Sequence, residues 1–287
     1  MSSQTKALLA IITAATLGSG SVIFAKLGLR EVPPFTFMFL RFLIASLLIL
    51  PFYLKSPLPP HRLWPPILIS LFSSANIFLF AFGIRLTTAT ASQVIYSIVP
   101  IITAILAYFL VKEQFNQKKI VGIALGFFGL LVIIGLPQTL TGNFLLLMGA
   151  VLYSFYPVLS KKIQVQYSPW QLTTMFIFTT TILGGVFSLT ELRQIPAWFP
   201  TASALAWFSL IFVAIIGTII YYWLTQGAIK HGSAVIGSII LYLQPVTTYL
   251  WAHFILKEQL TWEIVIGGSL VIGGAYLTTA AKKHETK

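Results

Sequence analysis

The sequence predicts an all-α polytopic membrane protein with ten transmembrane helices, arranged as two inverted-topology repeats of five helices each. Of the 287 residues, 57% are hydrophobic and only 8% are charged, whereas soluble domains carry about 25% charged residues. The apolar residues form ten long runs, and a pattern near the end of the first half of the chain recurs near the end of the second half.

Each apolar run is long enough to cross a bilayer as a helix, because about 20 residues span the roughly 30 Å of hydrocarbon. In chain order the predicted helices cover residues 7–29, 35–54, 64–84, 89–111, 120–136, 144–160, 170–190, 204–226, 234–256 and 262–281. Backbone groups in lipid need partners within the protein, so each run is a helix or a strand of a closed barrel. These runs are too long and too uniformly apolar for barrel strands.

The positions of lysine and arginine predict that both termini are cytoplasmic, because cytoplasmic loops retain these residues. If the N-terminus is inside, the inner set is Lys6, Lys55, Arg62, Lys112, Lys118, Lys119, Lys161, Lys162, Lys230, Lys282, Lys283 and Lys287. The outer set is only Arg30, Arg85, Arg193 and Lys257. The net charge of +12 therefore reflects topology, since nucleic-acid binders gather basic residues on one exposed face. We expect a multi-pass inner-membrane protein with no nucleic-acid partner.

The chain also contains an internal repeat. The segment PIITAILAYFLVKEQ at Pro100–Gln114 matches PVTTYLWAHFILKEQ at Pro245–Gln259, with proline, threonine, alanine, phenylalanine and Lys-Glu-Gln in register. Further equivalent pairs are Gly122 and Gly267, Gly129 and Gly274, Lys26 and Lys161, and Pro34 and Pro169. Because each copy has five helices, the second copy enters the membrane from the opposite face, as in many secondary transporters. We divide the chain into residues 1–138 and 139–287, one repeat each.

These features resemble the EamA family of the drug/metabolite transporter superfamily over nearly the whole chain. The first helix of each half has a turn of small or polar residues, GSGSVIFAKLGL from Gly18 and the weaker LYSFYPVLSKK from Leu152. A proline precedes each second helix, and the first half adds Arg41 in FLRFLIA, where the second half has Phe176. The resemblance implies a ten-helix carrier, often an exporter of amino acids, related metabolites or drugs, that works by alternating access without ATP.

Residues suited to catalysis are scarce. The chain has no cysteine and no aspartate, and its six glutamates lie near the ends of apolar runs. It has no GxxxxGK[ST] phosphate loop. A membrane-embedded enzyme would need a nucleophile with a base, a metal cluster or paired acids. We therefore expect no enzyme activity, no metal and no cofactor, while a channel, a scramblase or a non-transporting membrane sensor remains an alternative to a carrier.

Polar and aromatic residues at helical spacing are the candidates for lining a central substrate cavity. Pro100 and Pro245 occupy equivalent positions, and each frees a backbone carbonyl four residues earlier, at Tyr96 and Leu241. The cavity candidates are Ser73, Asn76, Gln93, Tyr96, Ser97, Pro100, Tyr153, Tyr156, Tyr221, Tyr222, Ser238, Tyr242, Gln244 and Pro245. Such residues also pack helices together in bilayers. A neutral, aromatic lining would suit an amino acid or a related amphipathic solute better than a highly charged phosphate, which requires several cations.

Four charged or titratable residues are candidates for gating or coupling: Arg41, Glu113, Glu258 and His253. Arg41 falls inside a predicted helix, where a cation needs a partner or must reach the headgroups. Arg41 and Glu258 fall on the same predicted side, which suggests a contact between them as a gate. Lys26 lies nearer the outer end and is expected to reach the headgroups. His253 could titrate in coupling to protons, and exchange against a counter-substrate is the alternative.

Overall fold

The computed structural model describes residues 3–111, 117–134, 140–231, 234 and 240–280, and its regular elements are helices. Before residue 135 they are α1 (Ser3–Gly28), α2 (Pro34–Leu54), η1 (Pro60–Arg62), α3 (Trp64–Arg85), α4 (Ala89–Tyr96), α5 (Val99–Val111) and α6 (Gln117–Ile134). After it they are α7 (Leu140–Ile163), α8 (Pro169–Ser188), η3 (Leu189–Gln194), α9 (Ile195–Trp198), α10 (Ala204–Ala214), η4 (Ile215–Ile220), α11 (Tyr221–His231), α13 (Ile240–Trp251), η5 (Ala252–Leu256) and α14 (Trp262–Ala280).

Many of these helices have the length and composition of membrane spans. Within the described ranges, six stretches are long and apolar enough to cross a membrane: Pro34–Leu54, Trp64–Arg85, Ala89–Leu110, Leu140–Ile163, Pro169–Trp198 and Ala204–His231. Ile120–Gly129 and Trp262–Gly274 are shorter apolar helices. Large apolar side chains such as Leu47, Phe109 and Ile182 are exposed on the outside of the bundle, where lipid would cover them. The chain is an all-helical, multi-pass membrane protein.

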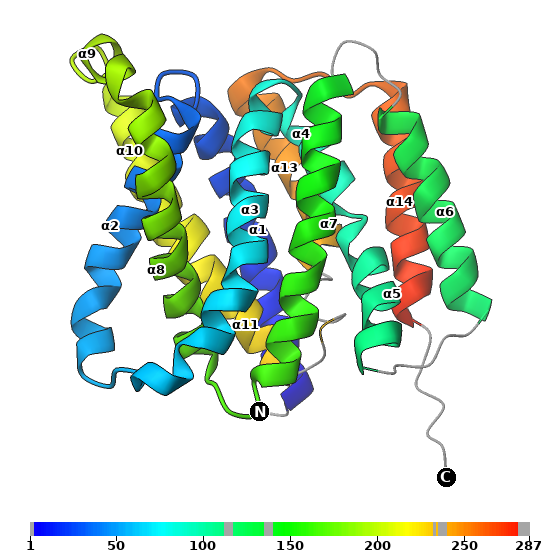
Figure 1. Ribbon diagram of the computed structural model, residues 1–287. Coiled ribbons are helices and arrows are strands. Elements are labelled where there is room, and N and C mark those ends of the chain that lie inside the picture. Colours follow the sequence, from blue (N-terminus) through cyan, green and yellow to red (C-terminus); the bar gives the residue numbers. More distant parts are fainter. Residues whose placement is uncertain (1–2, 112–116, 135–139, 232–233, 235–239, 281–287) are drawn as a thin grey trace.

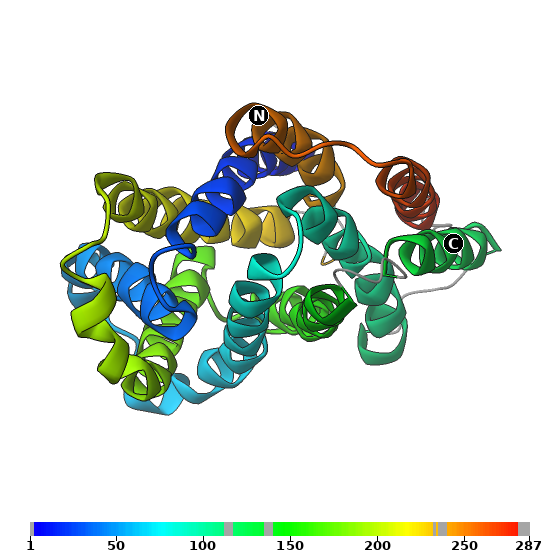
Figure 2. The ribbon, with the colours of Figure 1, turned by 90° about the horizontal axis from the view of Figure 1, so that it is seen from above.

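The long helices run side by side, and the two halves of the chain interleave (Figure 1). The lowest part of α1 and the end of α14 lie at the same end of the bundle, at the bottom of Figure 1. Helix α3 packs against α7, α2 against α8, and α1 against both α11 and α13. The view from above places α6 and α14 together at one edge (Figure 2). Each of these helix pairs joins one half of the chain to the other.

Three interruptions modify the predicted helices. The run at 89–111 is broken: α4 ends at Tyr96 and α5 begins at Val99, directly before Pro100. Proline has no N–H group, so Pro100 cannot donate to the carbonyl of Tyr96 and continue the hydrogen bonding of α4. The run at 204–226 instead contains a π-helical turn, η4, and a second π turn, η5, ends at Lys257 with a left-handed φ of 58°. Pro245 lies inside α13.

The contact between α6 and α14 depends on glycines that let the two backbones touch. A Cβ atom on Gly129 would lie 2.5 Å from the carbonyl oxygen of Gly267, and one on Gly274 would collide with the carbonyl oxygen of Gly122. Small residues have this role where membrane helices approach closely. The glycine spacing that marks the internal repeat therefore serves the packing of one half against the other.

Replacing Gly274 with valine should destabilise the protein by about 1–3 kcal/mol, because overpacking forces the two helices apart. The matched control is Gly273→Val, since a Cβ atom at the neighbouring Gly273 meets nothing within 4 Å. Thermal unfolding of the two variants in the same detergent should show a clear fall in the unfolding temperature for Gly274→Val only. Equal unfolding temperatures for both variants would contradict the packing described.

Candidate functional site

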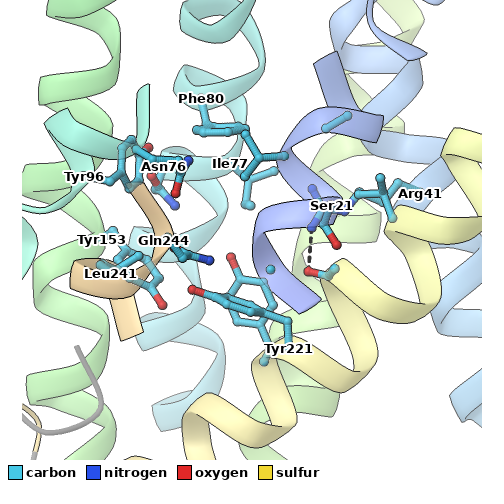
Figure 3. A pocket seen from close by; sticks show the side chains of 17 residues that line it. Ser21, Arg41, Asn76, Ile77, Phe80, Tyr96, Tyr153, Tyr221, Leu241 and Gln244 are labelled. Atoms are coloured by element: carbon cyan, nitrogen blue, oxygen red, sulfur yellow. Dashed lines mark hydrogen bonds between the residues drawn. The ribbon is translucent and has the colours of Figure 1, made fainter. Parts of the chain in front are cut away.

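A cavity of about 80 Å³ lies at the centre of the bundle, between helices of both halves (Figure 3). This volume has room for several water molecules. The described residues that line it are Gly18, Ser21, Val22 and Ala25 from α1, Arg41 from α2, Asn76, Ile77 and Phe80 from α3, Gln93 and Tyr96 from α4, Tyr153 from α7, Val213 and Gly217 from α10 and η4, Tyr221 and Tyr222 from α11, and Leu241 and Gln244 from α13.

Five aromatic residues and three side-chain amides are among the residues that line the cavity. The hydroxyl of Tyr96 donates a hydrogen bond to Oδ1 of Asn76. The rings of Tyr221 and Tyr222 meet edge to face with centroids 5.3 Å apart, and Tyr222 packs on Phe176 at 4.3 Å. These tyrosines are neutral, so their rings and hydroxyls offer contact and hydrogen bonding to a solute without adding charge.

Gly18 lets two of these groups approach α1. A Cβ atom at this position would overlap the side-chain amide of Gln244 and lie 2.8 Å from the ring of Tyr221. The small-residue turn of the first helix therefore makes space for side chains from the second half of the chain.

Arg41 brings a positive charge to the cavity although its side chain is only 5% exposed. Its Nε donates to the hydroxyl of Thr218 at 2.6 Å, and its Nη2 donates to the carbonyl oxygen of Gly217 at 2.9 Å. Its Nη1 lies 3.8 Å from the sulfur of Met38, and its guanidinium carbon lies 5.1 Å from the centre of the Phe42 ring. The side chain is thus held in one position by neutral groups.

The π turn η4 supplies the two oxygen partners of Arg41. In a π turn the backbone hydrogen bonds span five residues, and such turns are frequent at functional sites. Here the hydroxyl of Thr218 donates to the carbonyl of Val213, five residues earlier, while also accepting from Arg41. The carbonyl of Gly217 is turned towards the guanidinium. An undistorted helix would direct that carbonyl along its own axis.

The break between α4 and α5 meets α13 directly. The hydroxyl of Ser97 donates to the carbonyl oxygen of Leu241 at 2.9 Å, which is the carbonyl that Pro245 leaves without an intrahelical partner. This hydrogen bond therefore joins the two segments that contain the matched prolines, at the point where each lacks a regular helical backbone hydrogen bond.

An ion pair joins the two halves at the end of the bundle shown at the top of Figure 1. The Nζ atom of Lys26 lies 3.2 Å from Oε1 of Glu258 and donates to the carbonyl of Thr87 at 2.5 Å. The Glu258 carboxylate also accepts from the backbone N–H groups of Ala89, at 2.8 Å, and Thr90, at 3.1 Å. These are the first N–H groups of α4, where a carboxylate is favoured by the helix dipole.

Two further carboxylates accept hydrogen bonds at or beside the N-terminus of a helix that belongs to the other half of the chain. Glu191 is 6% exposed and accepts from the backbone N–H groups of Phe35, at 3.2 Å, and Thr36, at 2.7 Å, and from the Thr36 hydroxyl at 2.8 Å. Glu31 accepts from the backbone N–H and the hydroxyl of Ser203, both at 2.7 Å, beside the start of α10.

The two donors of Ser203 lower the pKa of the exposed Glu31 carboxyl below its usual value. The stabilisation from this contact is therefore present at neutral pH and is lost only as the pH falls through the lowered pKa.

The structure brings half of the predicted cavity residues together. Those that line the cavity are Asn76, Gln93, Tyr96, Tyr153, Tyr221, Tyr222 and Gln244. The structure buries five others that are not among the described lining residues: Ser73, Ser97, Pro100, Tyr156 and Pro245. Ser238 and the side chain of Tyr242 lie outside the described parts of the structure, as does Glu113. His253 is exposed, with Nδ1 3.2 Å from the carbonyl oxygen of Glu258.

The predicted contact between Arg41 and Glu258 is wrong. The structure places Glu258 against Lys26, which was expected to reach the headgroups, and places Arg41 against Thr218 in the cavity. The prediction used only depth in the membrane, whereas the partner also depends on which side of its helix a residue faces. The π turn and the cap that Glu191 provides were also not predicted from the sequence.

Comparison with known proteins identifies the family. The EamA-like transporter family matches residues 5–135 and again residues 140–280. An uncharacterized transporter of Archaeoglobus fulgidus is 29% identical, over 99% of this chain and 100% of its own length. The S-adenosylmethionine uptake transporter of Rickettsia prowazekii is 26% identical, over 96% and 95% of the two chains. A solved crystal structure with 20% identity covers 98% of this chain and 99% of its own, with a TM-score of 0.71, and so shares the fold. The chain belongs to the EamA-like transporter family.

Proposed function

We propose that this protein is a secondary transporter that exports a small metabolite, such as an amino acid or a related amphipathic solute, by alternating access. The observation that carries the proposal is the central cavity, whose wall is built by helices from both halves of the chain. Substrate sites of transporters with inverted repeats lie at the interface of the repeats, near the middle of the membrane.

The proposal includes ten membrane helices in two inverted repeats, residues 1–138 and 139–287, with both termini in the cytoplasm. The helix contacts support this arrangement, because helices in equivalent places of the two repeats make equivalent contacts. Helix α3 packs on α7, and its counterpart α11 packs on α1, the counterpart of α7. In the same way, α5 packs on α7 and its counterpart α13 packs on α1. Positions matched by the repeat also meet at the cavity, because Gly18 and Tyr153 both line it, as do Tyr96 and Leu241. A pseudo-two-fold axis that relates the two repeats would produce these equivalent contacts.

The two ends of the bundle would open in turn. Lys26 and Glu258 hold one end together, and the internal repeat matches them in sequence to Lys161 and Glu113. Lys161 donates to the carbonyl of Ile229 at 2.9 Å. Coupling would come from exchange against a counter-substrate, or from protons through Glu113, Glu258 or His253. The relative that takes up S-adenosylmethionine, a metabolite that contains an amino-acid group, supports the proposed class of solute.

Release from liposomes tests the proposal. The purified protein is reconstituted into liposomes loaded with a cytosolic metabolite extract, and mass spectrometry identifies which compounds leave faster than from protein-free liposomes. We expect selective release of one class of compound, with a rate that saturates as its internal concentration rises. A rate that does not saturate would indicate a channel, and an effect on lipids alone would indicate a scramblase. Absence of selective release in either gradient direction would favour a sensor.

A further inference from the structure

Within the described parts of the structure, the cavity has a buried cation and no buried anion to balance it. Arg41 is the only charged side chain among the described residues that line the cavity, and none of these residues is an aspartate or a glutamate. Among the described residues, the one ion pair within 4.0 Å joins Lys26 to Glu258 and does not involve Arg41. A charge at this depth is costly to hold in a membrane and usually pairs with an opposite charge or marks a pathway for a solute.

The guanidinium group also has donors left over. An arginine side chain carries five N–H donors, and Arg41 directs three of them at Thr218, Met38 and Gly217. The described residues offer no acceptor to the other two. A planar group with two donors at the wall of a cavity matches the two oxygen atoms of a carboxylate, which arginine binds in a forked arrangement.

We propose that Arg41 binds a carboxylate group of the transported solute, and that the tyrosines of the cavity contact the rest of the molecule. This inference rests on the proposed transport function and names the chemical class of its substrate. A single carboxylate balances the single positive charge of the cavity, whereas a phosphate group with a charge near −2 would leave an excess negative charge. Among the described residues that line the cavity none is an aspartate or a glutamate, so the solute itself supplies the anion that pairs with Arg41.

A purely structural role for Arg41 makes a different prediction. If the side chain served only to fix the π turn, a variant that retains its fold would keep the same preference among solutes. If Arg41 binds the solute, its loss changes which solutes are carried. The preference for a carboxylate over the matching amide is therefore the measurement that separates the two roles.

The first arm uses the unmodified protein in liposomes that contain the cytosolic extract. We expect the released compounds to carry a carboxylate, while polyamines, nucleosides and compounds whose only anion is a phosphate stay inside. Selective release of compounds without a carboxylate would overturn the inference and leave the transport function standing. Release of nothing would overturn the transport function and this inference with it.

The second arm compares Arg41→Met and Arg41→Lys with Arg85→Met, a matched control at the exposed end of α3. The probes are the main released carboxylate and its synthetic amide. Arg41→Met should lower the rate for the carboxylate about tenfold or more, and its preference for the carboxylate over the amide should vanish, because the charged hydrogen bonds are lost.

Arg41→Lys keeps the charge without the forked geometry, so the half-saturation concentration for the carboxylate should rise about tenfold while some preference remains. Arg85→Met should behave as the unmodified protein. Thermal unfolding checks that each variant is folded. If Arg41→Met does not fold, the half-saturation concentration of Arg41→Lys for the carboxylate tests the inference instead. A folded Arg41 variant with an unchanged preference for the carboxylate would overturn the inference.

Discussion

Replacement of Glu258 by alanine should lower the stability of the protein by about 3 kcal/mol and reduce transport strongly. The change leaves the ammonium group of Lys26, whose side chain is only 15% exposed, without its counter-charge. Removing one partner of a buried ion pair costs about 3–5 kcal/mol, and the lower end applies because this pair is partly exposed. The same change removes the acceptor of the first two N–H groups of α4.

Thermal unfolding and the initial rate of solute release measure the two effects. Glu263→Ala is the matched control, since Glu263 is an exposed glutamate close by in the first turn of α14. Adding Lys26→Met to Glu258→Ala should restore part of the lost stability, because it removes the uncompensated charge. If the double variant were less stable than Glu258→Ala alone, the ion pair would not be the origin of the effect.

The second large effect is expected at Glu191. Replacement by alanine removes the acceptor of three hydrogen bonds at the start of α2, two from backbone N–H groups and one from the Thr36 hydroxyl. Hydrogen bonds to charged groups contribute about 1.5–3 kcal/mol each, and they are not fully additive. Because the site is buried, water cannot replace the lost acceptor, so we expect a total loss of about 3–5 kcal/mol.

Glu31 offers a control for the role of burial. It makes a comparable contact beside the start of α10, through the backbone N–H and the hydroxyl of Ser203, but it is exposed to solvent. Glu31→Ala should therefore shift the unfolding temperature much less than Glu191→Ala, since water can satisfy the freed donors. Similar shifts for both variants would show that burial does not set the size of these contributions.

Much of the fold can be predicted from the sequence because the bilayer imposes a simple rule on apolar runs. The run at 64–84 became α3, and the run at 144–160 lies within α7. The break before Pro100 follows from the chemistry of proline, but its depth does not, because α4 must also fit against α13 and α5 against α7. The π turn is harder to predict, since it is stabilised by Arg41, an arginine from another helix.

The candidate cavity was partly predictable for a related reason. Asn76, Tyr96 and Tyr221 are polar or amphipathic residues within apolar helices, which is a local signal. The partner of a charged residue is not a local signal in the sequence, since Lys26 and Glu258 are 232 positions apart. The internal repeat fixes the approximate depth of such residues but not the side of the helix they occupy.

The central claim, that the cavity is the pathway of the solute, can be tested with a single cysteine. The chain has no cysteine of its own, so Ser21→Cys places one thiol on the cavity wall without background. We expect a bulky thiol reagent to modify it, to stop the release of the solute from liposomes, and to act more slowly when the solute is present. A cysteine at the exposed Thr261 should be modified without effect. Complete modification of Ser21→Cys, verified by mass spectrometry, with transport unchanged would show that the solute passes elsewhere.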